Sequence, residues 1–292
     1  QEVIDLMEED FTAAASLITS TDINYPTVDF VTFARARAAL FTGDYAAAIS
    51  NATTIINKYS LANAVDYAAM FGGDANSSEV IFKFDNVQGS NNSVAGNFIF
   101  TGTGGDFIEA SSELFNAFSA GDIRRDIVMI PSVSPQNTGN ALSVNKYPPN
   151  NDQNYINDYK MMRVSEMYLV RAEANARKAA PDFAAAAADI ATLRTARGSS
   201  DATPAAYADL VSAIQDIKDE RRLELCFEGH RYVDIKRYAS ILNVGITRDP
   251  VDVSYLGNNF PSTVTATDNR LVFPLPDAEI AGNPLITQAP GY

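Results

Sequence analysis

The sequence predicts a mainly α-helical fold, and the strongest evidence is a pattern that occurs twice. Residues 33–59 read FARARAALFTGDYAAAISNATTIINKY, and residues 168–198 read YLVRAEANARKAAPDFAAAAADIATLRTARG. Each segment has a helix with small residues on one face, a short break, an aromatic residue and an alanine-rich second helix. Alanine lets helix axes approach closely, and the aromatic side chain packs between the paired helices. The pattern is typical of tetratricopeptide-type hairpins, although two units do not make a regular array. A generic alanine-rich bundle is the alternative.

The rest of the chain divides around these two hairpins. EVIFKF at 79–84 alternates in the manner of a β-strand, with Val80, Phe82 and Phe84 on one side. Residues 86–106 and 131–158 are long segments rich in Asn, Ser, Gly or Pro, with a short strand expected at 98–100. We expect helices near residues 2–18, 28–42, 44–59, 112–120, 160–178, 182–197, 205–228 and 230–240.

We expect a single domain over residues 1–292 with four regions. These are a helical hairpin region at 1–65, a loop-rich ligand lobe with small β-hairpins at 66–158, a helical region at 159–240 and an irregular tail at 241–292. The tail carries prolines at 250, 261, 274, 276, 284 and 290.

Composition excludes several classes of partner and cofactor. The net charge of −14 disfavours nucleic acid and anionic membrane surfaces as partners. No apolar run reaches the roughly eighteen residues that span a bilayer. The chain has one histidine and one cysteine, so multi-histidine zinc sites and thiolate cages are excluded. Asp152, Asn154 and Asp158 cluster, but Ile156 and Arg163 occupy ligand positions of an EF-hand loop. We expect no metal and no cofactor, with hard-cation binding by loop oxygens as the alternative.

Two short motifs suggest catalysis only at first reading. GTGGDF at 102–107 has Phe107 where the third glycine of a dinucleotide-binding loop belongs. AFSAG at 117–121 is close to a nucleophile elbow around Ser119, but it ends a predicted helix rather than linking a strand to a helix. We therefore predict no catalytic residue, although the 36 acidic residues leave a glycoside hydrolase carboxylate pair open.

The segment ERRLELCFEGHRYVDIKRY at 220–238 concentrates the charge of the helical region. Arg221 falls on the same apolar helix stripe as Ile214 and Leu225, and a buried arginine needs a paired charge and satisfied donors. His230 is expected to be a structural histidine beside Glu228 or Asp234, with a general base as the alternative. We predict a structural ion network formed by Glu220, Arg221, Glu224, Glu228, Arg231, Asp234 and Glu166, with Arg221 and Arg231 buried and paired.

The same segment resembles the signature of the SusD/RagB family, approximately ER-x-x-EL-x-FEG-x-R-x-x-D-x-x-R. DIRR at 122–125, MMRVSEMYLVRAEANAR at 161–177 and LRTARG at 193–198 resemble further family segments in the same order. The last of these has Thr192 or Leu193 where the family has asparagine. FPLPDAEIAGNPLITQAPGY at 273–292 resembles the family's closing segment, with Ala289 in place of asparagine.

The resemblance implies a surface-exposed outer-membrane lipoprotein of Bacteroidetes-type bacteria that takes part in nutrient uptake. Such a protein binds an oligosaccharide or polysaccharide and delivers it to a TonB-dependent (SusC-like) transporter. The alternatives are a RagB-like protein that binds a peptide or another nutrient and, ranked last, a glycoside hydrolase. We expect a lipid-bearing cysteine and first helices to precede this sequence, because Cys226 lies in a core helix. The family fold combines tetratricopeptide-like hairpins with a loop-rich lobe, and its signature residues are structural.

Sugar rings bind aromatic faces together with planar hydrogen-bonding side chains. The chain has no tryptophan, so tyrosine and phenylalanine in the polar loops are the best candidates. For the phenylalanines, burial in a local hairpin is the alternative. The predicted ligand-binding residues are Phe98, Phe100, Phe107, Tyr147 and Tyr155, with Asn97, Asp106, Asn150, Asp152 and Asn154 as polar contacts.

Overall fold

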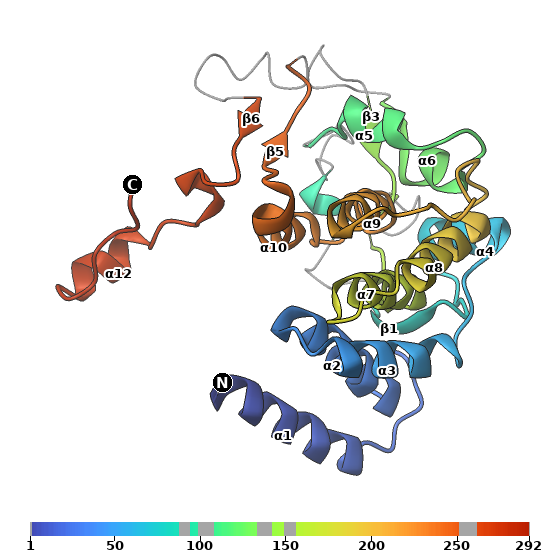
Figure 1. Cartoon of the computed structure of the whole chain (residues 1–292), viewed down its shortest axis with the longest axis horizontal. Helices are drawn as coiled ribbons and strands as arrows, with labels where there is room; N and C mark the ends of the chain where they lie inside the picture. Colours follow the sequence, from blue (N-terminus) through green and yellow to red (C-terminus); the bar gives the residue numbers. More distant parts are fainter. Residues whose placement is uncertain are drawn as a thin grey trace.

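The helices of the chain pack on one another in successive layers, as the computed structural model shows (Figure 1). The structure describes residues 2–87, 94–98, 108–132, 142–148, 156–250 and 262–291. The helices of the layers are α1 (Glu2–Leu17), α2 (Val28–Thr42), α3 (Tyr45–Ile56), α7 (Val164–Arg177), α8 (Phe183–Ala196), α9 (Leu210–Glu224) and α10 (Arg231–Leu242). Helix α3 packs on α7, which packs on α8 and α9, and α10 covers α9. The predicted mainly α fold is confirmed.

Local signals in the sequence set the ends of the paired helices. The Thr27 side chain accepts a hydrogen bond from the backbone N–H of Phe30 and starts α2. Gly43, with φ 85°, ends α2 in the left-handed conformation, and Asp44 then caps α3. Asp182 caps α8 in the same way, and the break between the helices lies where the repeated pattern predicts it.

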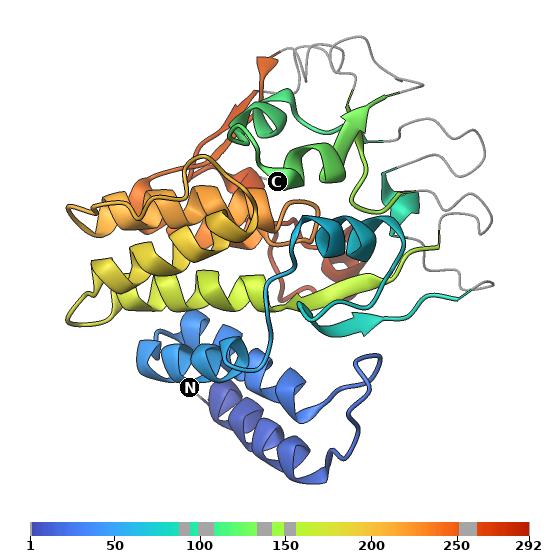
Figure 2. The same cartoon turned by 90° about the vertical axis from the view of Figure 1, so that its right-hand side faces the viewer.

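A smaller lobe lies at one end of the stacked helices (Figure 2). Its short helices are α4 (Ala64–Gly72), η1 (Ala95–Asn97), α5 (Ser112–Ala117) and α6 (Ile123–Val128). Its strands form two antiparallel pairs, β1 (Val80–Phe84) with β4 (Tyr159–Arg163) and β2 (Met129–Pro131) with β3 (Leu142–Val144).

Two sequence predictions are corrected in this lobe, and two helices are added to those expected. Residues 160–163 belong to β4 rather than to the start of a helix, because they pair with β1. Helices α4 and α6 were not predicted. Val80 and Phe82 are buried but Phe84 is 51% exposed, because register shifts along β1 break the simple alternation.

The described part of the tail after α10, residues 243–250 and 262–291, has little regular structure. It contains the short pair β5 (Ile246–Thr247) with β6 (Thr263–Val264), the turn η3 (Asn269–Leu271) and α12 (Asp277–Gly282). Gln288 fixes the last turn by bonding both the N–H and the C=O of Leu275, at 2.9 and 3.0 Å.

Three apolar clusters make up the described core. The first joins α2 and α3 to β1 and α7, and the second lies between α7, α8, α9 and α10. The third fills the smaller lobe around Tyr67, Phe71 and Leu114. The charged side chains described next lie where the lobe meets α7–α9.

Candidate functional site

A close backbone contact brings the lobe against the end of α8. Gly121 (φ +80°) and Gly198 (φ +66°) approach so closely that a Cβ on either would lie 2.9 Å from the other's carbonyl oxygen. The N–H of Ile123 donates to the carbonyl of Arg197 at 2.9 Å, and the hydroxyls of Ser119 and Ser199 lie 2.7 Å apart. Ser119 thus joins two loops, and the AFSAG motif is a packing junction rather than a nucleophile elbow.

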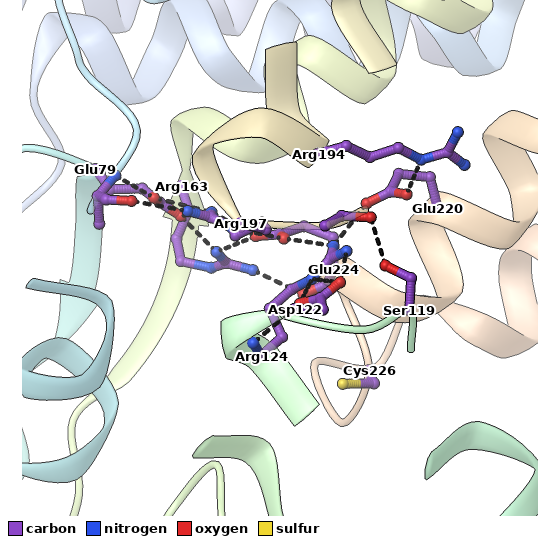
Figure 3. Close-up of polar contacts among 12 residues, drawn as sticks. Glu79, Ser119, Asp122, Arg124, Arg163, Arg194, Arg197, Glu220, Glu224 and Cys226 are labelled. Carbon is purple, nitrogen blue, oxygen red and sulfur yellow. Dashed lines mark hydrogen bonds and ion pairs between the residues drawn. The ribbon is translucent and has the colours of Figure 1, made fainter. Parts of the chain in front are cut away.

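Glu224, at the C-terminal end of α9, lies at the centre of a buried ion network (Figure 3). Its Oε1 accepts hydrogen bonds from Arg163 at 2.7 Å and Arg197 at 2.8 Å. Its Oε2 accepts from Arg124 at 3.1 Å and from Arg197 at 3.0 Å. Glu224 and all three arginines are at most 1% exposed, so one carboxylate links α6, β4, α8 and α9.

Four further carboxylates complete this network. Glu79 accepts from Arg163 at 2.6 Å and from Arg197 at 2.8 and 2.9 Å. The remaining contacts are Asp122 with Arg124, Glu220 with Arg124 and Arg194, and Glu228 with Arg163 and Lys146. Each of these carboxylates therefore contacts at least one cation.

The electrostatics fit a structural role. Burial alone would raise the pKa of Glu224, but the charges of Arg197 and Arg163 outweigh it and hold that pKa well below its usual value. The pKa of Glu228 is also lowered, because Arg163 and Lys146 outweigh burial. A general acid needs a pKa near the working pH and a reachable proton, and these ionised, buried carboxylates have neither. The network stabilises the junction between lobe and helices.

A second set of ion pairs links α2, α7, α9 and α10. Glu166 accepts two hydrogen bonds from Arg37, at 2.8 and 2.7 Å, and its Oε2 lies 3.9 Å from Nε2 of His230. Burial lowers the pKa of His230 below its usual value. Arg221 Nε donates to Asp234 at 2.9 Å. Glu173 accepts from Arg237 at 2.6 and 3.0 Å and from the Tyr238 hydroxyl.

The predicted ion network is thus found as two separate sets. Glu220, Glu224 and Glu228 belong to the first set, whereas Glu166, Arg221 and Asp234 belong to the second. The prediction for Arg231 is corrected: it is only partly buried, and no carboxylate among the described residues forms an ion pair with it. Sequence reasoning missed Glu79, Arg124, Lys146, Arg163 and Arg197, although Arg124, Arg163 and Arg197 lie in the quoted motifs DIRR, MMRVSEM and LRTARG.

The predicted ligand-binding aromatics are partly outside the described residues. Phe100, Phe107, Tyr155, Asp106, Asn150, Asp152 and Asn154 lie there, and their roles stay predictions. Tyr147 is 1% exposed and Phe98 is half-buried, with their rings parallel at 6.2 Å between centroids. Phe227 and Tyr159 cover their other sides, so Tyr147 offers no free face to a sugar in this structure. Asn97 is exposed beside Phe98.

Two half-exposed tyrosines line an open groove on the helical face instead. The groove has a volume of about 740 Å³ and lies between the end of α3, α7, α8 and residues 202–204. Tyr59 and Tyr168 form its aromatic walls, and the hydroxyl side chains of Ser60, Thr192 and Thr195 lie beside them. The tyrosine rings are of the kind on which sugar rings stack, and the hydroxyls of Thr192 and Thr195, which donate to the carbonyls of Ala188 and Ala191, can still accept hydrogen bonds.

The described residues hold no group of three or more His, Cys, Asp or Glu side chains arranged to bind a metal ion. Across the described ranges, every helix is too short or too polar to span a membrane.

The family comparison covers four of the five quoted segments in full, since DIRR at 122–125 lies before the matched range. The model of the SusD family matches residues 133–292, more than half of the chain. The chain belongs to the SusD family. None of the curated protein sequences compared with it matches.

Solved SusD-family structures share the fold at low sequence identity. A SusD superfamily protein from Bacteroides thetaiotaomicron is 22% identical with a TM-score of 0.72, covering 99% of this chain and 66% of that chain. One from Bacteroides vulgatus is 21% identical with a TM-score of 0.74, covering 100% and 65%. Surface glycan-binding protein A from Bacteroides uniformis is 20% identical with a TM-score of 0.72, covering 99% and 67%. The chain therefore spans about two thirds of the length of these structures.

The segments that resemble the SusD signature meet at the buried networks. DIRR supplies Arg124, MMRVSEM supplies Arg163 and Glu166, LRTARG supplies Arg197, and the 220–238 segment supplies the glutamates between them. In this chain the family motifs thus serve mainly to hold the two parts of the fold together.

Proposed function

We propose that this protein binds a glycan at the bacterial surface and delivers it to a TonB-dependent outer-membrane transporter. The observation that carries the proposal is its membership of the SusD family, together with a fold shared with two surface glycan-binding proteins A, from Bacteroides uniformis and Bacteroides thetaiotaomicron. In this proposal the protein is a lipoprotein exposed on the outer membrane, and the transporter is its protein partner.

The pairing of the buried carboxylates favours a binding protein over a glycoside hydrolase. A retaining or inverting glycosidase needs two carboxylates facing a cleft, one of which stays protonated near neutral pH. The deeply buried glutamates of this protein are instead engaged by arginine or lysine. We therefore propose a binding protein rather than an enzyme.

Two surfaces are candidates for the glycan. One is the loop-rich lobe, where Tyr155 remains the best stacking candidate from the sequence. The other is the groove of Tyr59 and Tyr168, whose half-exposed rings lie beside hydroxyl side chains. The groove is the better supported of the two, because its tyrosines are partly exposed while Tyr147 and Phe98 are packed together, although Arg171 lies over the Tyr168 ring at 5.7 Å from its centroid.

The test is native gel electrophoresis with a panel of polysaccharides in the gel, comparing wild type with Tyr155→Ala and Tyr168→Ala. We expect retardation by at least one polysaccharide, no release of reducing ends, and loss of retardation in one variant at an unchanged melting temperature. Release of reducing ends would identify a hydrolase. Retardation by no polysaccharide, with micromolar binding of a peptide, would favour the RagB-like alternative. Co-purification of the transporter from detergent-solubilised membranes tests the partner.

A further inference from the structure

A cavity separate from the tyrosine groove lies between α5, α9, α10 and β5. Its volume is about 380 Å³, within the range of small-molecule sites. Its walls are largely apolar and include Leu114, Leu225, Phe227, Tyr232, Ile235 and Ile246. Arg221, Arg222, Arg231 and Arg248 also line it, against the two carboxylates of Glu109 and Asp234. An apolar cavity with an excess of arginine is unusual in a chain whose net charge is −14.

The arginines of this cavity differ in how their donors are used. Arg222 is engaged by Glu113 at 2.7 Å, and Arg221 uses its Nε on Asp234 at 2.9 Å. Arg221 is only 2% exposed, yet its Nη1 is buried without a hydrogen-bond partner. The Nη1 of Arg231 is likewise buried without a partner, and Arg231 has no ion pair with a described carboxylate. Two guanidinium groups that line one cavity therefore each have a buried nitrogen without a hydrogen-bond partner.

The surroundings leave the charge of Arg231 poorly compensated. Burial lowers its pKa, and the neighbouring Arg222 lowers it further, while Asp219, Asp234 and Glu113 only partly oppose this. Asp234 is itself shared between Arg221 and Arg237, at 2.9 Å each. Arg231 is partly buried, and burying a charge without a partner costs free energy of folding, so an anion in the cavity would lower that cost.

We propose that this cavity binds a small organic carboxylate with an apolar body. The carboxylate would accept hydrogen bonds from Arg231 and Arg221, because guanidinium donors match the two oxygens of a carboxylate. The apolar body would lie against Leu114, Phe227 and Ile235. Inorganic phosphate fits less well because it leaves the apolar walls wet, and a neutral sugar leaves the arginine charge unpaired. This site is independent of the proposed glycan function.

The probe is benzoate, with benzamide as its neutral counterpart of the same shape, measured by isothermal titration calorimetry and thermal unfolding. We expect benzoate to bind wild type and to raise its melting temperature, with benzamide at least tenfold weaker. Arg231→Leu should weaken benzoate at least tenfold without lowering the melting temperature, because it removes an uncompensated charge. Arg125→Leu removes an arginine on α6 that is paired with exposed Asp126, and should behave as wild type.

Arg231→Gln provides a second test if the leucine variant fails to fold, because it keeps a polar side chain and loses the charge. It should weaken benzoate to the same extent. Equal binding of benzoate and benzamide, no binding of benzoate, or undiminished binding by the folded Arg231 variants would each overturn the proposal. Polysaccharide retardation should be unaffected by Arg231→Leu, which separates this site from glycan binding.

Discussion

Replacing Glu224 by glutamine removes one negative charge from the centre of the buried network while keeping the size of the side chain. Each oxygen of Glu224 accepts hydrogen bonds from two arginines. Whichever oxygen becomes the amide NH₂ group, two arginine N–H donors lose their acceptor and face another donor. The three buried guanidinium groups are then balanced by one negative charge fewer.

The expected cost is large because none of these groups can reach water. Glu224, Arg124 and Arg197 have fully buried side chains, and Arg163 is 1% exposed. Breaking a buried pair by removing one partner costs about 3–5 kcal/mol. At roughly 2 °C per kcal/mol for a chain of this size, the melting temperature should fall by about 6 °C or more.

Urea denaturation and calorimetry measure this loss, with Glu113→Gln as the matched control. Glu113 also bonds an arginine at 2.7 Å, but its side chain is 40% exposed. Solvent screens such a pair, so the control should lose about 1 kcal/mol or less. If Glu224→Gln cost no more than Glu113→Gln, the network would not brace the fold and the structural interpretation of the family motifs would fail.

Three further predictions concern stability and accessibility. Burial alone would raise the pKa values of Glu166 and Glu173, but their arginine partners outweigh it and lower both from 4.5 to about 2. The unfolded chain therefore binds protons first, and the urea midpoint should fall as the pH drops from about 4.5 toward 2; a midpoint unchanged between pH 5 and pH 3 would contradict this. Burial raises the pKa of the Cys226 thiol, so Cys226 should react with a thiol reagent only after unfolding, and rapid labelling of native protein would refute its burial. Tyr147→Ala should cost about 3–5 kcal/mol in urea denaturation because the ring is fully packed, and an unchanged midpoint would show that Tyr147 is free to bind ligand.

The sequence by itself determined the helical pairs and their turns. Asp44 and Asp182 cap the second helix of each pair, and Gly43 supplies the left-handed turn before the first of them. These capping signals act between residues a few positions apart, so a short stretch of sequence is enough to predict where these helices begin and end. The family motifs could also be recognised in the sequence, and they predicted the fold.

Contacts between segments that are distant in the sequence decided the features that a short stretch of sequence could not predict. Residues 160–163 carry a pattern that suits a helix, but hydrogen bonds to β1 hold them in a strand. Tyr147 lies in a polar stretch of sequence, yet its ring is buried by Phe98 and Tyr159, which come from other segments. Burial of a side chain depends on which distant segments pack against it, and spacing along the chain does not contain that information.

Arg221 and Arg231 of the 220–238 segment show the same difference between sequence and tertiary structure. The sequence predicts burial and a carboxylate partner for Arg221 and Arg231 alike, since both lie among acidic residues. In the folded chain Arg221 bonds Asp234, whereas Arg231 lines the cavity between α5, α9 and α10 and its Nη1 is buried without a hydrogen-bond partner. An ion pair requires atoms within about 4 Å, and only the packing of α10 on α9 decides which arginine meets a carboxylate at that distance.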